Sequence, residues 1–255
     1  MFLLFFSQLG EKTLAFLEKA GHLTTLTVES LKHTRNLNVR QLFKQMAHLG
    51  VDSLPIVLLT IFFTGMVITV QTAQEFIKYG AQSTIGGVVT ISMARELSPV
   101  LTGVVAAGRI GAAITAEIGT MKVTEQVDAL RVMAVNPIEY LVVPRLWACV
   151  IMLPVLVIFA NAIGIAGSFL VTRFYDGITT VMFMNSIKMF AVPYDVIGGV
   201  IKAAFFGAII AIVGCLKGLR SATGAEGVGK ATTESVVFSI ILIFAANYIL
   251  SVIIY

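Results

Sequence analysis

Arg95 and Glu96 are the residues of this sequence whose chemistry most needs an explanation. They stand side by side inside an apolar stretch that continues well to either side of them. An ionisable residue at membrane depth costs about 2.5 to 3.5 kcal/mol on insertion scales, so a pair of them is by default a functional-site hypothesis. The alternative is that both lie near the membrane surface and extend to water along their aliphatic stems. The length of the flanking apolar sequence favours the first interpretation.

Pro99 follows the charged pair and lacks the backbone N–H that a helix uses, so it predicts a kink or a local opening there. The stretch then carries small residues at four-residue spacing, Ala107 with Gly111 and Ala112 with Ala116. Such spacing lets helix backbones approach closely in lipid. Either another helix of the same chain or a second copy of the chain could pack on this face.

The pattern changes after Thr120. Val123, Val127, Leu130 and Ala134 fall on one face of a helix, and most of the charged residues between them lie elsewhere. The spacing predicts a short amphipathic helix over about residues 119 to 134, outside the hydrocarbon and continuous with the charged segment. The Asn-Pro pair at 136–137 ends it.

The composition is that of an integral membrane protein. The 255 residues are 57% hydrophobic and 13% charged, with a mean hydropathy of +0.93, whereas a soluble domain carries about 25% charged residues. Apolar runs of about 20 residues predict an all-α protein with five transmembrane helices. We expect them near residues 54–73, 84–117, 141–171, 196–216 and 236–254.

Several finer expectations concern the third and fourth spans and the segments beside them. Pro154 predicts a kink in the third span, and a loop holding Asp176 and Asp195 should follow that span. Lys202 lies near the start of the fourth span and should reach the membrane surface. Small residues recur along the fourth span, and a Gly-rich loop, RSATGAEGVGKATTES, should precede the fifth.

Residues 1–50 are basic and amphipathic, and no part of them is apolar enough to span. They predict one or two interfacial helices on the membrane surface, the alternative being a solvated extension. The chain would then divide into this region and a five-span helix bundle over 51–255. His22, His33 and His48 lack metal-ligand spacing.

Lys and Arg concentrate before the first span, between the second and third spans, and in the Gly-rich segment. By the positive-inside rule, these regions face the cytoplasm. Five spans then place the N-terminus in the cytoplasm and the C-terminus on the outer side.

The sequence offers no residue set for thiol chemistry, nucleotide binding, catalysis or metal binding. Cys149 and Cys215 lie in apolar segments and predict small buried side chains. The segment GAEGVGKA at 224–231 departs from a phosphate-binding loop at Ala231, where a hydroxyl should stand. No Ser/His/Asp set, HExxH motif or metal cluster is visible, and the net charge of +4 requires no nucleic acid.

The central block resembles a known family. RELSPVLTGVVAAGRIGAAITAEIGTMKVTEQVDALRVMAVNPIEYLVVPRLWA is similar to the signature of MlaE/YrbE permeases, subunits of ABC transporters that move phospholipids between membranes, and GAEGVGKATTESVV looks like the family's last loop and span. The resemblance runs from about residue 50 to the C-terminus. It implies a homodimer of five-span subunits with a lipid pocket between them, two copies of an ABC ATPase beneath, and an MCE-domain protein on the outer side.

The resemblance also implies roles for particular residues. Arg95 and Glu96, with Pro99 beside them, correspond to the lipid-binding region, and Glu96 of one subunit could orient Arg95 of the other. A direct pair between these adjacent residues is not expected, because they point in different directions on a helix. The family's cytoplasmic coupling helix corresponds to Glu117, Gly119, Lys122, Glu125, Gln126, Asp128 and Arg131. Replacing Glu125 and Asp128 should lower ATPase association without unfolding the bundle.

The predicted function is therefore the non-catalytic permease of an ATP-driven lipid transporter, with no cofactor on this chain because ATP and Mg²⁺ belong to the ATPase. The family resemblance implies the bacterial inner membrane, or the plastid inner envelope in a plastid-bearing host. Two alternatives differ in chemistry. A channel or ion-coupled transporter would act without an ATPase and would carry several ionisable residues along its path. An intramembrane enzyme would need a nucleophile and a base.

Overall fold

The computed structural model describes residue 18 and residues 21–255. The part of the chain that it describes is helical and contains no strand, and five helices are long and apolar enough to cross a membrane. The predicted all-α fold with five spans is confirmed. The predicted interfacial region covers residues 1–50, and its first 20 residues, except residue 18, lie outside the described part of the chain.

The helical runs that could span the membrane are longer than their apolar centres. They cover Val39–Lys78, Gln82–Val123, Ile138–Phe174, Pro193–Leu219 and Gly224–Ile254. Most connecting segments are short, because polar residues at the ends of each apolar run continue the helix. The Gly-rich segment before the fifth span is the clearest case, since the expected loop is mostly the first turns of a helix that begins at Gly224. The expectation of a long loop there is wrong.

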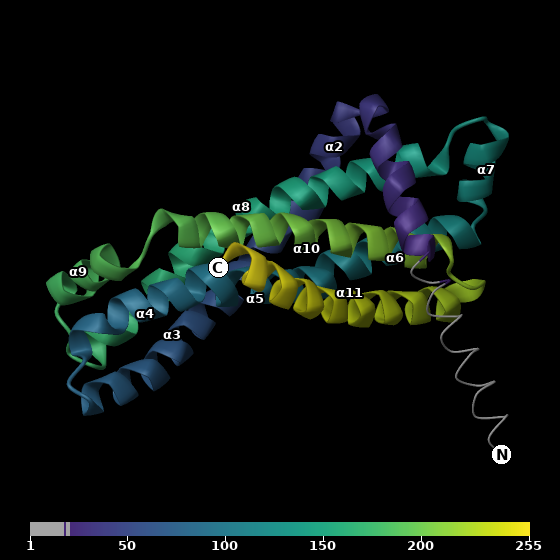
Figure 1. The fold of residues 1–255 in the computed structure, drawn as a ribbon. Helices are drawn as coiled ribbons and strands as arrows, with labels where there is room; N and C mark the ends of the chain where they lie inside the picture. The colour runs from purple at the N-terminus through teal and green to yellow at the C-terminus, as the bar shows by residue number, and fades with distance from the viewer. Residues whose placement is uncertain (1–17, 19–20) are drawn as a thin grey trace, which may run out of the picture.

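Figure 1 shows the spans side by side, with α9 at one end of the molecule and α6 and α7 at the other. The main helices and their bounds are α2 (Val39–Gln45), α3 (Leu54–Lys78), α4 (Ile85–Ser92), α5 (Ser98–Ala106), α6 (Ala112–Val123), α7 (Gln126–Val132), α8 (Val143–Phe174), α9 (Thr180–Phe190), α10 (Pro193–Leu219) and α11 (Gly224–Ile254). Helix α8 packs against α3 and α10, and α10 also packs against α6 and α11.

The second span is continuous but changes its pitch twice. The π-helical segments η5 (Met93–Leu97) and η6 (Ala107–Gly111) lie between α4, α5 and α6. Pro99 stands in the first turn of α5, directly after η5. The helix therefore departs from regular α geometry directly before Pro99, where a kink or a local opening is expected, and it does so as a wider π turn. Helix α8, in contrast, runs unbroken through Pro154.

The segment after the third span contains a helix that the sequence analysis missed. Thr179 caps α9 by accepting a hydrogen bond from the backbone N–H of Met182, at 3.4 Å. Helix α9 packs on α4, where the N–H of Gly87 donates to Ser186 Oγ at 2.8 Å. The expected plain loop between the third and fourth spans is wrong, because an amphipathic helix folds back onto the start of α4.

Small residues bring the spans together within one chain. A Cβ atom at Gly214 of α10 would lie 3.3 Å from the carbonyl oxygen of Gly111, and one at Gly207 would lie 2.4 Å from that of Cys149. Ala107 and Gly111 are themselves buried. This face of the second span therefore serves intramolecular packing, one of the two uses that the sequence left open. Cys149 and Cys215 are buried free thiols, as predicted.

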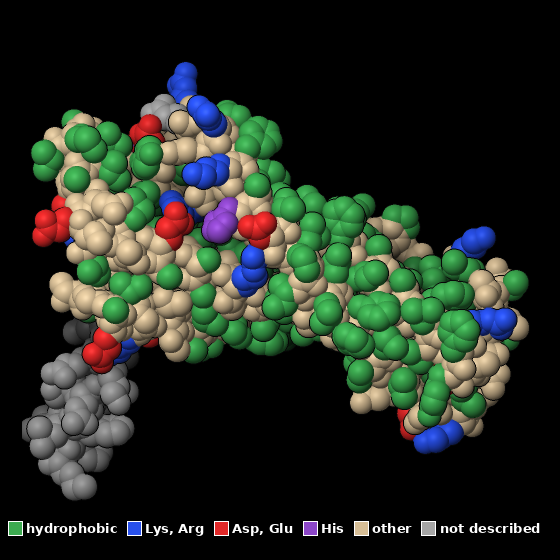
Figure 2. Space-filling model, turned by 180° about the vertical axis from the view of Figure 1, so that it is seen from behind, with side chains coloured by type: hydrophobic (Ala, Val, Ile, Leu, Met, Phe, Trp, Pro, Cys, Tyr) green, Lys and Arg blue, Asp and Glu red, His purple; other side chains and the backbone are tan. Residues whose placement is uncertain are grey.

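Hydrophobic side chains cover the middle of the molecule in Figure 2, and most of the charged side chains visible on that face lie toward its two ends. The exposed apolar residues include Phe63 and Val67 of α3 and Phe244 and Tyr248 of α11. A face of this kind cannot be left in water at low cost, and it matches the hydrocarbon of a bilayer. The chain is a membrane protein.

We predict that Gly65→Ala weakens the packing of α3 on α8. A Cβ atom at Gly65 would lie 2.3 Å from the carbonyl oxygen of Gly164, a backbone atom inside the long helix α8 that cannot move aside as a flexible side chain could. Overpacking of this kind costs about 1 to 3 kcal/mol. The midpoint of thermal unfolding in detergent should fall.

Gly229→Ala in α11 is the matched control, because a Cβ atom there meets nothing within 4 Å. Its unfolding midpoint should stay unchanged or rise slightly, since Ala is the better helix former. Equal midpoints for the two variants would contradict the close approach of α3 and α8.

Candidate functional site

Arg95 and Glu96 are adjacent in sequence and, as predicted, do not pair with each other. Each of them binds a residue of α10 instead. Arg95 Nε donates to Asp195 Oδ1 at 2.8 Å, and Asp195 is buried. The second carboxylate oxygen of Asp195 accepts from the backbone N–H of Val192 at 3.0 Å, which caps the start of α10. An acidic residue in the first turn of a helix is stabilised by the free N–H groups there. Asp195 therefore links the charged segment to a helix N-terminus.

Glu96 binds the most deeply buried cation of the described chain. Lys202 Nζ donates to Glu96 Oε1 at 2.8 Å, and the Lys202 side chain is 0% exposed. The same ammonium donates to the carbonyl oxygen of Arg95 at 2.9 Å. In a regular α-helix that oxygen would accept from residue 99, which is Pro99 and has no N–H. The lysine thus supplies a donor where the proline removes one.

Helix α11 completes the network with three polar residues spaced four apart. Asn247 Nδ2 donates to Glu96 Oε2 at 2.8 Å, and Ser251 Oγ donates to Glu96 Oε1 at 2.9 Å. Tyr255 OH donates to the carbonyl oxygen of Asp195 at 3.0 Å, and the Arg95 guanidinium lies 4.6 Å from the centre of its ring. Segment η5, α10 and α11 therefore meet at one cluster, named here the charged network: Arg95, Glu96, Asp195, Lys202, Asn247, Ser251 and Tyr255.

The charged network has a buried side and an open side. Asp195 and Lys202 are 2% and 0% exposed, whereas Arg95 and Glu96 keep 38% and 41% of their side-chain surface. The two cations and two anions balance. The buried members fix the positions of the open ones, which remain able to contact a ligand or a second protein copy.

Two expectations about this region are wrong. Lys202 was expected to reach the membrane surface, but it points into the bundle because Glu96 and the Arg95 carbonyl offer it partners there. Asp195 was expected in a loop, but it lies in the first turn of α10. Pro99 is buried, and its ring comes within 3.0 Å of where a Cβ atom at Gly199 would lie. Asn247, Ser251 and Tyr255 were missed, although polar residues at i, i+4 and i+8 in an apolar span were a usable signal.

Comparison with known proteins identifies the kind of protein that carries this network. The model of the family Permease MlaE matches residues 42–253. The chain is 49% identical over 215 residues to a probable ABC transporter permease of Synechocystis, covering 84% of this chain and 82% of that protein. It is 40% identical over 247 residues to one of Rickettsia felis, covering 96% and 95%. The chain belongs to the MlaE permease family.

A further relative comes from a plant. The chloroplastic protein TRIGALACTOSYLDIACYLGLYCEROL 1 of Arabidopsis thaliana is 40% identical over 232 residues, which cover 91% of this chain and 65% of that protein. As an ABC transporter permease of the MlaE family, the chain is the membrane component of a transporter that uses a partner ATPase. The family recognised in the sequence is confirmed.

The region expected from the resemblance to be the coupling helix is a bent corner in this MlaE permease. The single helix expected over residues 119 to 134 is wrong, because α6 ends at Val123 and α7 begins only at Gln126. Glu125 between them has a positive φ of 61°, a conformation that ends a right-handed helix. Gln126 and Glu125 lie exposed at the turn.

Ion pairs hold this corner. Asp128 accepts from Lys122 at 3.0 Å and from Arg131 at 3.1 Å, so it ties α7 back to the end of α6. The hydrogen bond from Lys122 lowers the pKa of Asp128, and the neighbouring Arg131 charge acts in the same direction. Asp128 is therefore a structural centre of the corner.

Glu117 and Gly119 lie one turn further into the bundle. Glu117 Oε2 is 2.9 Å from Arg145 Nη2, and Arg145 is nearly buried at the start of α8. Gly119 faces the beginning of α11, where a Cβ atom would lie 3.2 Å from Val228. These contacts fix the end of α6 against two other spans.

The corner also exposes apolar side chains that the sequence analysis did not single out. Val132, the last residue of α7, is 89% exposed, and Met133, which follows it, is 64% exposed; both lie outside every spanning run. Apolar side chains exposed together outside the membrane are typical of a protein contact. Among the described residues, no group of His, Cys, Asp and Glu is arranged to hold a metal ion.

We predict that Lys202→Met destabilises the bundle by about 3 kcal/mol. The substitution leaves the Glu96 carboxylate without its cation, and breaking a buried pair costs about 3 to 5 kcal/mol. The lower end applies because Glu96 is 41% exposed. Thermal unfolding in detergent measures the change.

Glu96→Gln combined with Lys202→Met should recover most of the loss, because no unpaired charge remains. A double variant as unstable as Lys202→Met alone would show that the lysine does not act through Glu96.

Proposed function

We propose that this chain is the non-catalytic permease of an ATP-driven phospholipid transporter. Two observations support lipid as the cargo: membership of the MlaE permease family, and a plant relative whose name contains a glycerolipid. ATP and Mg²⁺ would be bound by the partner ATPase, and this chain would hold no cofactor. The transporter would move phospholipid between membranes.

The observation that carries the proposal is the open side of the charged network. Arg95 and Glu96 lie within a membrane-spanning run yet stay partly exposed, while Asp195 and Lys202 are buried behind them. In the described part of the chain, only Nε of the Arg95 guanidinium has a hydrogen-bond partner. Its two terminal nitrogens can therefore donate to a lipid phosphate, and such charge-assisted bonds are strong where water is scarce.

The pocket would be completed by a second copy of the chain. Leu59, Phe63 and Val67 repeat along α3, and Phe244 and Tyr248 expose apolar surface on the C-terminal half of α11. A homodimer packed through such surfaces would place the two Arg95 and Glu96 pairs around a shared cavity. Glu96 of one subunit could then orient Arg95 of the other. Pro99 would shape the wall of this cavity, because its missing N–H favours the irregular turn that carries Arg95 and Glu96.

The α6–α7 corner would receive the ATPase. Exposed Val132 and Met133 offer an apolar contact, and Glu125 and Gln126 surround it with polar groups. An unbroken helical run joins Val123 to the charged network through α6, η6 and α5. Closure of two ATPase subunits could then move this run, and the π-helical segments provide places where its turns can rearrange.

The orientation follows from charge. The corner and the segment between α10 and α11 carry Lys and Arg and would face the cytoplasm, which places the C-terminus outside. An MCE-domain protein would dock on the opposite end, beside α9. A bacterial inner membrane fits the bacterial relatives, and a plastid inner envelope fits the chloroplastic one.

Arg95→Ala should reduce the phospholipid that co-purifies with the complex at least about tenfold. Hydrogen bonds to charged groups contribute about 1.5 to 3 kcal/mol each, and the substitution removes the proposed phosphate ligand. Mass spectrometry of lipids extracted from the purified complex gives the measurement. Arg173→Ala, an exposed arginine at the end of α8, is the control and should change nothing.

Unchanged lipid in the Arg95→Ala complex would refute the lipid site. If the purified wild-type chain conducted ions in planar bilayers without any ATPase, the channel alternative would replace the proposal.

Val132→Asp combined with Met133→Asp should lower recovery of the ATPase with tagged permease at least about tenfold. Burying unpaired carboxylates in an interface costs several kcal/mol. This pair gives a cleaner test than Asp128, whose replacement would also break its bonds to Lys122 and Arg131.

Val181→Asp is the control, because Val181 is 69% exposed on α9 at the opposite end of the molecule. It should leave ATPase recovery unchanged. Full recovery with the double variant, in a complex that elutes normally on gel filtration, would move the docking site away from the corner.

A further inference from the structure

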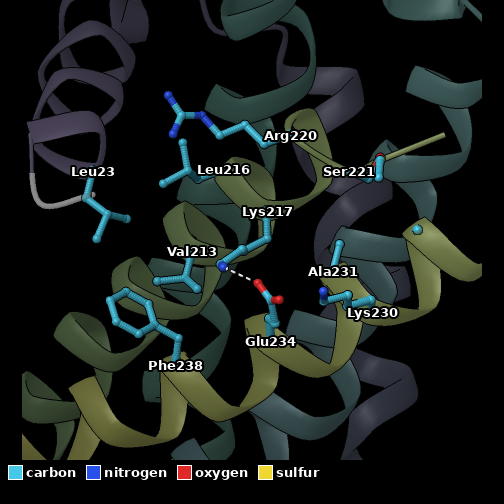
Figure 3. Close-up of a pocket in the computed structure, with 12 residues that line it drawn as sticks. Leu23, Val213, Leu216, Lys217, Arg220, Ser221, Lys230, Ala231, Glu234 and Phe238 are labelled. Atoms are coloured by element: carbon cyan, nitrogen blue, oxygen red, sulfur yellow. Dashed lines mark hydrogen bonds and ion pairs between the residues drawn. The ribbon is translucent and has the colours of Figure 1, made fainter. Parts of the chain in front are cut away.

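A separate cavity of about 340 Å³ lies between the C-terminal end of α10, the first turns of α11 and Leu23. Figure 3 shows Lys217 and Glu234 meeting near its centre, with Leu23 and Phe238 on one side and Lys230 on the other. The cavity lies near the α6–α7 end of the bundle, because Ser221 and Val228 pack on Gly119. It shares no residue with the charged network.

The lining of this cavity is divided by chemistry. Lys217, Arg220 and Lys230 stand around it with one carboxylate, Glu234, which accepts from Lys217 at 2.6 Å. Leu23, Val213, Leu216 and Phe238 supply apolar surface. A lining that combines an excess of positive charge with apolar surface is complementary to a molecule with an anionic head and a hydrocarbon tail.

The apolar part continues beyond the cavity. A neighbouring hollow of about 280 Å³ shares Lys217, Glu234 and Phe238 with it and extends over Val237 and Ile241. Val237 and Ile241 are 53% and 57% exposed. From Lys230 to Ile241 the helix rises about 16 Å, which is about half the thickness of the hydrocarbon core. The groove therefore has the reach of one acyl chain within one leaflet.

We propose that this groove binds an acidic phospholipid from the surrounding bilayer, distinct from any lipid that is transported. Arg220 and Lys230 contact the phosphate, and one acyl chain lies along α11 over Phe238, Val237 and Ile241. A soluble protein partner fits less well, because the groove runs from the end of the bundle into the apolar part of a spanning helix. The proposal depends on the membrane-spanning structure and not on lipid transport or on the orientation of the chain.

The test uses the intact chain in detergent, titrated with phosphatidylglycerol and, separately, with phosphatidylcholine, with binding measured by native mass spectrometry. Arg220→Gln with Lys230→Gln should weaken phosphatidylglycerol binding about thirtyfold, since a basic side chain near an anionic surface contributes about a factor of five. Phosphatidylcholine binding should change little. Lys78→Gln with Lys188→Gln is the matched control, because both lysines are exposed and lie outside the groove.

A second variant tests the acyl-chain part. Ile241→Asp places a charge in the acyl-chain part of the groove and should also weaken phosphatidylglycerol binding. The weak competition of inorganic phosphate with the lipid headgroup should stay unchanged. If inorganic phosphate alone displaced the lipid at similar concentration, the site would bind free anions and the proposal would fail.

Two further results would overturn it: equal losses in the groove and control variants, or unchanged phosphatidylglycerol binding in the groove variant. If unchanged binding were accompanied by a loss of the ATPase or of the dimer, the surface would be assigned to a protein contact. Because Arg95 lies outside the groove, failure of the Arg95→Ala test leaves this result unaffected, and the two proposals fail separately.

Discussion

The ammonium group of Lys202 has no exposure to solvent, and much of the structure around it satisfies that single charge. Removing such a group from water costs several kcal/mol unless oxygen atoms replace its hydration. Glu96, the carbonyl of Arg95 and Ser251 supply those oxygens from two separate spans. Helices α10 and α11 and segment η5 must therefore meet at this point. The close helix packing allowed by Gly199 and the helix opening before Pro99 both serve that meeting.

The charged network and the α6–α7 corner lie on one helical run but differ in how they are held. At the network, buried ion pairs and side-chain amides leave few ways for the groups to rearrange. At the corner, Asp128 binds Lys122 and Arg131 on an exposed surface, where each pair contributes little. In the proposed mechanism, the ATPase would therefore act on the more weakly held corner, and the charged network would resist the movement.

The sequence predicts the bundle well because hydrocarbon imposes a simple rule: each crossing needs a long apolar helix. The sequence also identifies Arg95 and Glu96 as candidate site residues, since charged residues are conspicuous in an apolar segment. Their partners were harder to see. Asp195 sits near a span boundary where acidic residues are common, and Lys202 was close enough to a helix end to suggest a surface position. Only the folded arrangement shows that both face inward, because the rotation of each helix about its axis depends on packing.

Helix ends were the other weak point. The break at Glu125 depends on one backbone conformation that no residue pattern specified, and Glu is not a residue that favours it. The sequence does not indicate helix α9, because its eleven residues are too few to span a membrane and stand between charged residues of a connecting segment. The Gly-rich segment of α11 predicts a loop, since glycine is a poor helix former, yet packing against Gly119 and α10 keeps it helical.

The π-helical turn at Met93–Leu97 has a consequence for how this sequence can change over time. A π turn is equivalent to one residue inserted into an α-helix, and each residue of an α-helix turns the chain by about 100°. Losing one residue there would restore a regular helix with the flanking segments nearly in register, but it would change the directions of the side chains within the turn. Arg95 and Glu96 could then no longer both reach α10. The length of Met93–Leu97 is therefore as constrained as the identity of its residues. A deletion there would disrupt the charged network even at positions where a substitution is tolerated.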